Sequence, residues 1–166
     1  NKNKFKILDL KSPFLEKAIY ESCKIKKNVV EKDEKEKNFR KILNLGHTFG
    51  HAYEASNKYK KNLNHGEAVI LGIISSAKFS LLNKIISQNI YDKIIGHIRE
   101  LNLSFNLNKY FKRKDIKLIL RYMKSDKKNN NEQINLILIK NFGKIILDKR
   151  FNERQIKNFL KLELNN

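Results

Sequence analysis

Residues 68 to 82 form a long, mostly apolar run in which Ala and Gly stand among larger side chains. A run of this length and composition is typical of a helix that is buried in a protein interior. His65-Gly66 stands just before it and marks where it opens. A buried helix requires a core, and 166 residues are enough for one domain that has one. We therefore predict a single domain over residues 1–166.

Capping residues and the spacing of apolar side chains predict the elements around this helix. A first helix follows Ser12-Pro13, read as an N-cap and a first-turn proline, and ends within residues 31–37. Its apolar face includes Cys23, which we expect in the core. The other predicted elements are a helix from Ser87 to about Leu101, an irregular stretch at 102–112, a short amphipathic helix at 115–124, a strand at 134–138, a turn at 141–143, a returning strand at 145–147 and a helix from Asn152 to about Leu162. The predicted fold class is mainly α, multi-helix, with a small β-hairpin near the end of the chain.

The chain is strongly basic, with a formal net charge of +19. Such a charge favours a polyanionic partner, either nucleic acid or a phosphorylated substrate. However, Lys, Asn and Ile are abundant along the whole chain, and the basic residues neither gather in one stripe nor alternate with aromatic residues as on a single-strand-binding surface. We therefore expect compositional drift together with steering of phosphorylated substrates, and no nucleic-acid partner.

The same composition argues against a membrane or secreted protein. No stretch of about 18 uncharged apolar residues occurs, so we expect no membrane partner. The first residues lack an apolar signal core, and the single cysteine, Cys23, cannot form an internal disulfide, which suits a reducing cytoplasm. The chain does not begin with Met, so we expect that it is cut from a longer one.

Three of the four histidines, His47, His51 and His65, fall close together in the sequence. The first two are four residues apart and share one face if they lie on a helix. Imidazole nitrogens at this spacing are typical of a metal site, and catalytic zinc takes three protein ligands and keeps one position open. Ordinary capping or surface histidines are the alternative. The glycines Gly46, Gly50 and Gly66 weaken a helix, so they indicate close backbone approach to a ligand or another helix.

Two polar residues extend this pattern upstream. Arg40 and Asn44 precede His47 by seven and three residues, so one continuous helix would place them on one stripe with His47 and His51. A stripe of this kind is costly to bury without partners and fits the wall of a polar pocket. The Arg fork suits phosphate or carboxylate, and Asn supplies both a donor and an acceptor.

These residues carry a resemblance to a known family. The strings NLGHTFGHAYE at residues 44–54 and HGEAV at residues 65–69 closely resemble the signature of the 3-dehydroquinate synthase family. Two flanking segments resemble the same family: KKNVV at residues 26–30 with DEKE at 33–36, and MKSDKK at 123–128. The resemblance spans about residues 14 to 148. It implies the multi-helix C-terminal domain of the dehydroquinate synthase-like fold.

The resemblance also implies a role for each matched residue. His47 and His65 correspond to zinc-binding histidines, with cobalt as a second metal that such ligands hold. His51 and Glu36 correspond to residues assigned to proton transfer. The residues that correspond to substrate-binding positions are Lys26, Arg40, Asn44 and one or both of Lys127 and Lys128, of which Lys128 is favoured.

The implied activity is that of an NAD- and zinc-dependent carbon–oxygen lyase. It would convert the phosphorylated sugar acid 3-deoxy-arabino-heptulosonate 7-phosphate into 3-dehydroquinate and phosphate, in the shikimate pathway of aromatic amino acid biosynthesis. Members of this family commonly dimerise, so a homodimer is expected. The alternatives are a related cyclase that acts on another sugar phosphate, and a truncated, non-catalytic module that binds metal or a partner.

Two departures from the family pattern bear on this interpretation. No Gly-rich nucleotide fingerprint is present, so we expect NAD to be bound by an N-terminal domain in cis or trans that this chain lacks, and the chain alone to be inactive. The family's third zinc ligand is a glutamate before the first helix, where this chain has only Asp9. Either the chain begins just after that glutamate or this copy has lost it, and Glu54 and Glu67 are weaker alternatives.

Overall fold

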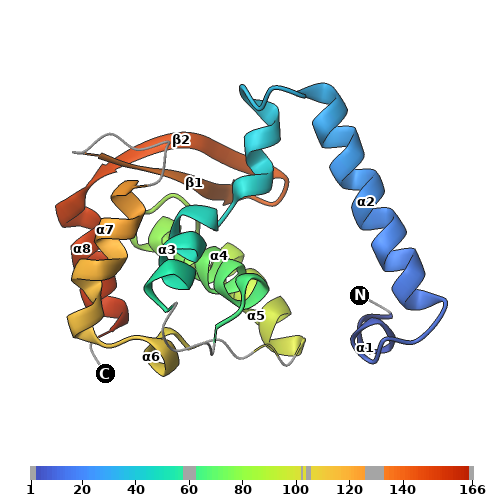
Figure 1. Cartoon of the computed structure of the whole chain (residues 1–166), viewed down its shortest axis with the longest axis horizontal. Coiled ribbons are helices and arrows are strands. Elements are labelled where there is room, and N and C mark those ends of the chain that lie inside the picture. The colour runs from blue at the N-terminus through green and yellow to red at the C-terminus, as the bar shows by residue number, and fades with distance from the viewer. Residues whose placement is uncertain (1–2, 58–62, 102, 104–105, 126–132, 165–166) are drawn as a thin grey trace.

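The computed structural model describes residues 3–57, 63–101, 103, 106–125 and 133–164. The described part is mainly helical with one antiparallel hairpin near its end, which confirms the predicted fold class (Figure 1). The elements are α1 (Lys4–Leu8), α2 (Phe14–Lys32), a 3-10 helix (Phe39–Asn44), α3 (His47–Ser56), α4 (His65–Leu82), α5 (Gln88–Glu100), α6 (Leu107–Tyr110), a second 3-10 helix (Arg113–Asp115), α7 (Ile116–Ser125), β1 (Gln133–Asn141), β2 (Lys144–Asn152) and α8 (Glu153–Glu163).

Helix α4 is the central element, as its apolar sequence predicts. It packs against α3, α5 and β1, and buries small residues such as Ala68 and Gly72 beside large ones such as Leu71 and Phe79. In length and composition α4 is the one helix of the described residues that is apolar enough to cross a membrane, but its position in the core accounts for that composition. Its N-terminus is fixed by Asn64.

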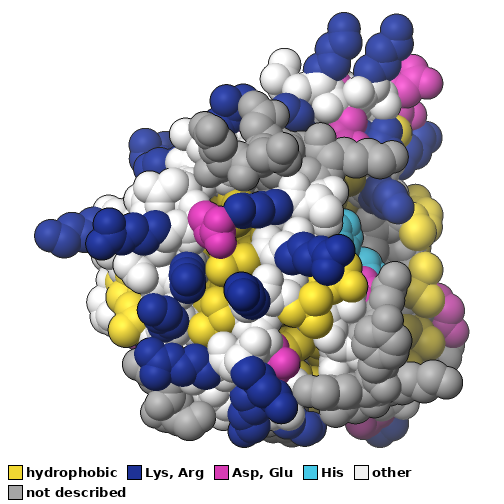
Figure 2. Space-filling view, turned by 60° about the vertical axis from the view of Figure 1, so that its left-hand side comes forward, with side chains coloured by type: hydrophobic (Ala, Val, Ile, Leu, Met, Phe, Trp, Pro, Cys, Tyr) yellow, Lys and Arg dark blue, Asp and Glu magenta, His cyan; other side chains and the backbone are white. Residues whose placement is uncertain are grey.

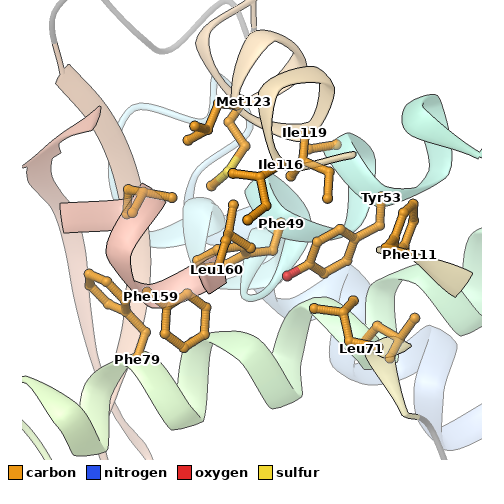
Figure 3. Packing of buried hydrophobic residues seen from close by; sticks show 14 of the residues in the cluster. Phe49, Tyr53, Leu71, Phe79, Phe111, Ile116, Ile119, Met123, Phe159 and Leu160 are labelled. Carbon is orange, nitrogen blue, oxygen red and sulfur yellow. The ribbon is translucent and has the colours of Figure 1, made fainter. Parts of the chain in front are cut away.

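An aromatic cluster ties α3, α4 and α8 together (Figure 3). The ring of Phe49 lies 5.6 Å from that of Phe159 and 6.3 Å from that of Phe79, measured between centroids. Tyr53, also on α3, is fully buried, and its hydroxyl lies 2.8 Å from the Ser75 hydroxyl on α4. Burying each large apolar side chain stabilises the fold by roughly 1.5–3 kcal/mol. One face of α3 is therefore fixed to the core, and its other face is available for chemistry.

The hairpin closes the other side of the core. Strand β1 presents Ile134, Leu136 and Leu138 to the interior, as the alternating sequence predicts, and pairs antiparallel with β2. The strands are longer than the sequence predicts. Asn152 ends β2 and caps α8, where its side chain accepts from the backbone N–H of Gln155 at 2.9 Å. The irregular stretch predicted at 102–112 contains the short helix α6.

Helices α1 and α2 stand away from the rest of the molecule (Figure 1). The prediction that Ser12 caps α2 is wrong by one residue: Pro13 occupies the N-cap position, and the helix begins at Phe14. The prediction that Cys23 is buried is also wrong, because Val29 is the buried residue of α2 and Cys23 is exposed. The contacts of α2 are with α1 and the first 3-10 helix, so its apolar face does not reach the core around α4.

Candidate functional site

The three clustered histidines meet at the junction of α3 and α4. His47 and His51 lie one turn apart on the face of α3 opposite Phe49, and His65 is the first residue of α4. Their ring centroids are 5.2 Å apart for His47 and His51, 6.2 Å for His47 and His65, and 5.9 Å for His51 and His65. Each ring offers a nitrogen, and the three nitrogens lie within 4.8 Å of one another. A divalent cation fits such a donor set, because zinc and cobalt accept imidazole nitrogen.

Among the described residues, two of the three rings have their Nδ1 atom next to an oxygen. The Nδ1 atom of His65 lies 2.9 Å from the Oε2 atom of Glu54, and the Nδ1 atom of His47 lies 3.3 Å from the carbonyl oxygen of Leu45. When Nδ1 donates to such an acceptor, Nε2 is left unprotonated and can bind a metal. This arrangement favours His47 and His65 as the ligand pair, although the distances alone admit His51 as well.

Close contact between α3 and α4 sets the distance between these histidines. Gly46 adopts φ +79°, which ends the preceding 3-10 segment and starts α3 at His47. A Cβ atom on Gly72 would lie 2.1 Å from the Gly46 oxygen and 2.7 Å from the Gly50 nitrogen. The prediction of close backbone approach is confirmed for Gly46 and Gly50. At Gly66 no other helix of the described residues comes close, because a Cβ atom would meet nothing nearer than 3.6 Å, so approach to a ligand stays a prediction there.

The predicted stripe does not lie on one helix, because the break at Gly46 separates Arg40 and Asn44 from α3. The structure still brings these residues together. A polar hollow of about 410 Å³ is lined by Lys26 from α2, Glu36, Arg40, Asn44 and His47, together with Ser22, Ile25 and Leu43. Five of the predicted site residues therefore share one cavity. His47 connects this hollow to the histidine group.

Contacts within the hollow orient its polar side chains. The Nδ2 atom of Asn44 donates to the Oε1 atom of Glu36 at 2.5 Å, and the Nη1 atom of Arg40 donates to the Glu34 carbonyl oxygen at 2.8 Å. Glu36 has φ +51°, so its backbone turns sharply just before the 3-10 helix. These bonds hold a carboxylate and a guanidinium at the edge of the same cavity.

Asp33 organises the loop that carries Glu36 and Arg40. Its carboxylate accepts the backbone N–H groups of Lys37 at 2.9 Å, Asn38 at 2.8 Å and Arg40 at 3.0 Å. The bonds from Arg40, Asn38 and Lys37 hold the pKa of Asp33 below its usual value. Sequence reasoning placed Asp33 in a matching segment but gave it no role. Its position one residue after a helix, where a short acid can bind the next N–H groups, was the available signal.

A smaller hollow of about 90 Å³ adjoins the first and is lined by Asn44, His47, His51, Thr48, Asn135, Ile137 and Asp148. Here the Oγ1 atom of Thr48 donates to the Asn135 carbonyl oxygen at 3.2 Å, which ties α3 to β1. Asp148 pairs with Lys41 at 2.5 Å and accepts from the Nδ2 atom of Asn135 at 2.8 Å. The hairpin therefore forms one wall beside the histidines.

Two apolar hollows elsewhere on the surface offer less chemistry. The larger, about 740 Å³, lies between the hairpin turn and the first 3-10 helix and is lined by residues such as Phe39, Ile42 and Ile145. The other, about 570 Å³, lies between α1, α2 and the end of α5. We assign the site to the polar hollow because acid, base, amide and imidazole groups converge there.

The carboxylates considered from the sequence as a third metal ligand make other contacts in the structure. The side chain of Glu67 accepts the Asn64 backbone N–H at 2.9 Å and so caps α4. Glu54 contacts His65, and neither glutamate belongs to the three-nitrogen group. Asp9 pairs with Lys11 at 3.3 Å in the segment between α1 and α2. Lys127 and Lys128 lie outside the described residues, so the prediction that they reach the substrate stays untested.

Sequence comparisons place the chain among known proteins. The family described as 3-dehydroquinate synthase C-terminal matches residues 1–129. The chain belongs to the 3-dehydroquinate synthase family. A 3-dehydroquinate synthase of Pelagibacter ubique (strain HTCC1062) is 53% identical over 164 residues, which is 99% of this chain and 45% of that protein. A 3-dehydroquinate synthase of Thermoanaerobacter sp. (strain X514) is 40% identical over 143 residues, 86% of this chain and 39% of that protein.

Solved structures share the fold. Two structures of 2-deoxy-scyllo-inosose synthase align with TM-scores of 0.62 and 0.66 at 19% and 21% identity. They cover 79% and 80% of this chain, and 36% of their own length in each case. The first of them was determined with carbaglucose-6-phosphate, NAD⁺ and Co²⁺. This 3-dehydroquinate synthase family chain thus spans less than half the length of the relatives it matches.

Proposed function

We propose that this chain is the metal- and substrate-binding part of a 3-dehydroquinate synthase. The whole protein would convert 3-deoxy-arabino-heptulosonate 7-phosphate into 3-dehydroquinate and phosphate, as a carbon–oxygen lyase of the shikimate pathway and aromatic amino acid biosynthesis. One observation carries the proposal: His47 belongs both to the three-nitrogen group and to the polar hollow that holds Lys26, Glu36, Arg40 and Asn44. A metal held there would adjoin a bound substrate.

His47 and His65 are proposed as the metal ligands in this chain, with zinc as the metal and cobalt as the alternative. Both have Nδ1 next to an oxygen, which leaves Nε2 for the cation. A divalent cation bound there would act as a Lewis acid that lowers the pKa of a substrate hydroxyl and polarises a ketone. A third ligand from another segment or chain would complete the tetrahedral set that such sites use.

Arg40, Lys26 and Asn44 are proposed to bind the substrate. The Arg40 guanidinium is held by the Glu34 carbonyl oxygen and leaves further donors for a carboxylate or phosphate. Lys26 is exposed on α2 and supplies a second positive charge to the same hollow. The strongly basic chain would also raise the local concentration of a phosphorylated substrate.

His51 and Glu36 are proposed to move protons. Glu36 accepts a hydrogen bond from Asn44, which fixes one oxygen and points the carboxylate into the hollow. His51 lines the adjoining hollow beside His47 and is exposed, so its ring can exchange protons with a ligand or with water.

The proposed partners follow from the family. NAD would be bound by a nucleotide-binding domain in cis or trans and would carry the hydride. We also propose a homodimer in the cytoplasm, without a nucleic-acid or membrane partner. Figure 2 shows Lys and Arg side chains spread over the visible face among hydrophobic and uncharged groups, rather than in one stripe. This spread favours general electrostatic steering over a nucleic-acid track.

A related sugar-phosphate cyclase is the second candidate, because the fold is shared with 2-deoxy-scyllo-inosose synthase. A truncated module that binds metal or a partner without catalysis is the third, because the described residues supply histidines but no carboxylate to the metal group.

The test combines this chain with the part of the Pelagibacter ubique relative that the chain does not match. Phosphate release and product identity are measured with 3-deoxy-arabino-heptulosonate 7-phosphate, NAD and zinc. We expect no turnover by the chain alone, formation of 3-dehydroquinate by the combination, and loss of turnover with His51→Ala. Metal binding without any turnover in the combination would favour the non-catalytic module. Turnover of another sugar phosphate alone would favour the related cyclase.

A further inference from the structure

Glu54 joins the two helices that carry the histidine group. It lies three residues after His51 and seven after His47, so all three project from the same side of α3. Its Oε2 atom lies 2.9 Å from the Nδ1 atom of His65, the first residue of α4. The contact therefore links α3 to the start of α4 next to the three-nitrogen group.

The position of this contact on the ring decides which nitrogen of His65 faces a metal. A carboxylate at Nδ1 accepts the Nδ1–H of a neutral imidazole, which leaves the lone pair on Nε2. The contact to Glu54 is shorter than the 3.3 Å contact between Nδ1 of His47 and the Leu45 carbonyl oxygen, and its acceptor is a carboxylate. His65 is thus the histidine of the group whose tautomer is most firmly set.

We propose that Glu54 is a positioning residue that holds His65 as the Nδ1–H tautomer, so that Nε2 binds the divalent metal. This inference rests on the metal part of the proposed function and adds a residue that acts on a ligand without touching the metal. It replaces the weaker sequence-based alternative in which Glu54 is itself the third ligand, because its carboxylate lies at the nitrogen of His65 that would not bind the metal.

If Glu54 only stabilised the fold, its loss would lower the melting temperature and leave the metal affinity nearly unchanged. The Glu54 and His65 side chains are 41% and 58% exposed, and polar contacts as exposed as this contribute little to stability. Loss of the carboxylate should then leave folding nearly unchanged and act on metal affinity. Carboxylates that orient metal-binding histidines change metal affinity by about 10- to 100-fold when they are removed.

The experiment compares the 166-residue chain with Glu54→Ala, which removes the acceptor, and with Glu16→Ala as the matched control. Both variants lose one negative charge, and Glu16 is exposed on α2, away from the histidines. Co²⁺ affinity is measured by the visible absorption of the bound ion, and the tautomer of His65 in the metal-free chain by the nitrogen chemical shifts of its ring. Melting temperatures of the metal-free chains report folding.

We expect Glu54→Ala to bind Co²⁺ about 10- to 100-fold more weakly and to lose the Nδ1–H preference of His65. Its melting temperature should equal that of the Glu16→Ala control. Unchanged Co²⁺ affinity or an unchanged tautomer would overturn the inference. If the unaltered chain binds no Co²⁺ even when the part of the Pelagibacter ubique relative that it does not match is supplied, the metal part of the proposed function fails. In that case the ring shifts of the metal-free chains still decide whether Glu54 sets the tautomer.

Discussion

Substitution of Gly72 by Ala tests whether close packing of α3 on α4 builds the site. The added Cβ atom would lie 2.1 Å from the Gly46 oxygen and 2.7 Å from the Gly50 nitrogen. Both are backbone atoms, so no side-chain rotation can relieve the overlap. The two helices must move apart, and His47 and His51 on α3 would move away from His65 on α4.

The magnitude follows from two opposing effects. Overpacking a close contact costs typically about 1–3 kcal/mol, and occasionally more where backbone must shift. Replacing Gly by Ala in a helix interior returns up to about 1 kcal/mol. With a contact as short as 2.1 Å, we expect a net loss of roughly 2 kcal/mol in the free energy of unfolding. For a chain of this size that loss corresponds to a fall of about 4–8 °C in melting temperature.

Gly96→Ala is the matched control. Gly96 lies inside α5, and a Cβ atom there would meet nothing within 4 Å. This variant should gain up to about 1 kcal/mol from helix propensity. Urea unfolding followed by circular dichroism measures both variants, and a Co²⁺ titration shows whether Gly72→Ala also weakens metal binding. If Gly72→Ala is as stable as Gly96→Ala, the close contact does not determine the packing of α3 on α4.

Three further changes have directions set by the structure. Burial raises the pKa of Glu163, so its ionised form destabilises the fold, and Glu163→Gln should melt at a higher temperature than the unaltered chain at pH 7. This difference should vanish below about pH 4, where Glu163 is protonated in both the folded and the unfolded chain. Burial also raises the pKa of Tyr53, whereas an unfolded tyrosine ionises at about pH 10, so the free energy of unfolding should fall as the pH rises above that value. Tyr53→Phe should remove this part of the loss. At pH 7 the variant should be less stable by about 1 kcal/mol in urea unfolding, because the bond to Ser75 is lost. Asp33→Ala should release the loop that holds Arg40 and weaken binding of the phosphorylated sugar acid in calorimetry, and an unchanged affinity would contradict its role.

Elements with strong local signals could be predicted from the sequence. The apolar run of α4, the Ser87 cap of α5 and the Asn152 cap of α8 each depend on residues within a few positions of one another. The alternation in β1 predicts Ile134, Leu136 and Leu138 in the main core, although Ile137 and Ile139 are buried as well. Local capping and periodicity are sufficient here because tertiary packing reinforces them.

Features that depend on distant contacts could not be predicted in the same way. The break at Gly46 places Arg40 and Asn44 outside α3. The glycine indicated a close backbone approach, but not the left-handed turn that interrupts the predicted helix. The exposure of Cys23 arises because α2 does not pack on the core, although its sequence has an apolar face. Arg40 and Asn44 nonetheless line the polar hollow together with His47.

The contact between Glu54 and His65 could be predicted from the sequence only in part. The spacing of His47, His51 and Glu54 at four and three residues predicts one helical face. That spacing could have indicated a carboxylate beside the histidines. Its pairing with His65 depends on how α3 and α4 meet, so the sequence left it as a candidate ligand rather than a residue that orients one.

Zinc titration of the purified chain by calorimetry tests the central claim most directly, with His47→Ala, His65→Ala and His51→Ala measured beside it. We predict one zinc ion per chain, much weaker binding in the His47 and His65 variants, and binding close to that of the unaltered chain in the His51 variant. Equal loss of zinc in all three variants would contradict the assignment and make His51 a ligand. The metal site itself would be contradicted if the unaltered chain bound no zinc even when the unmatched part of a relative is supplied.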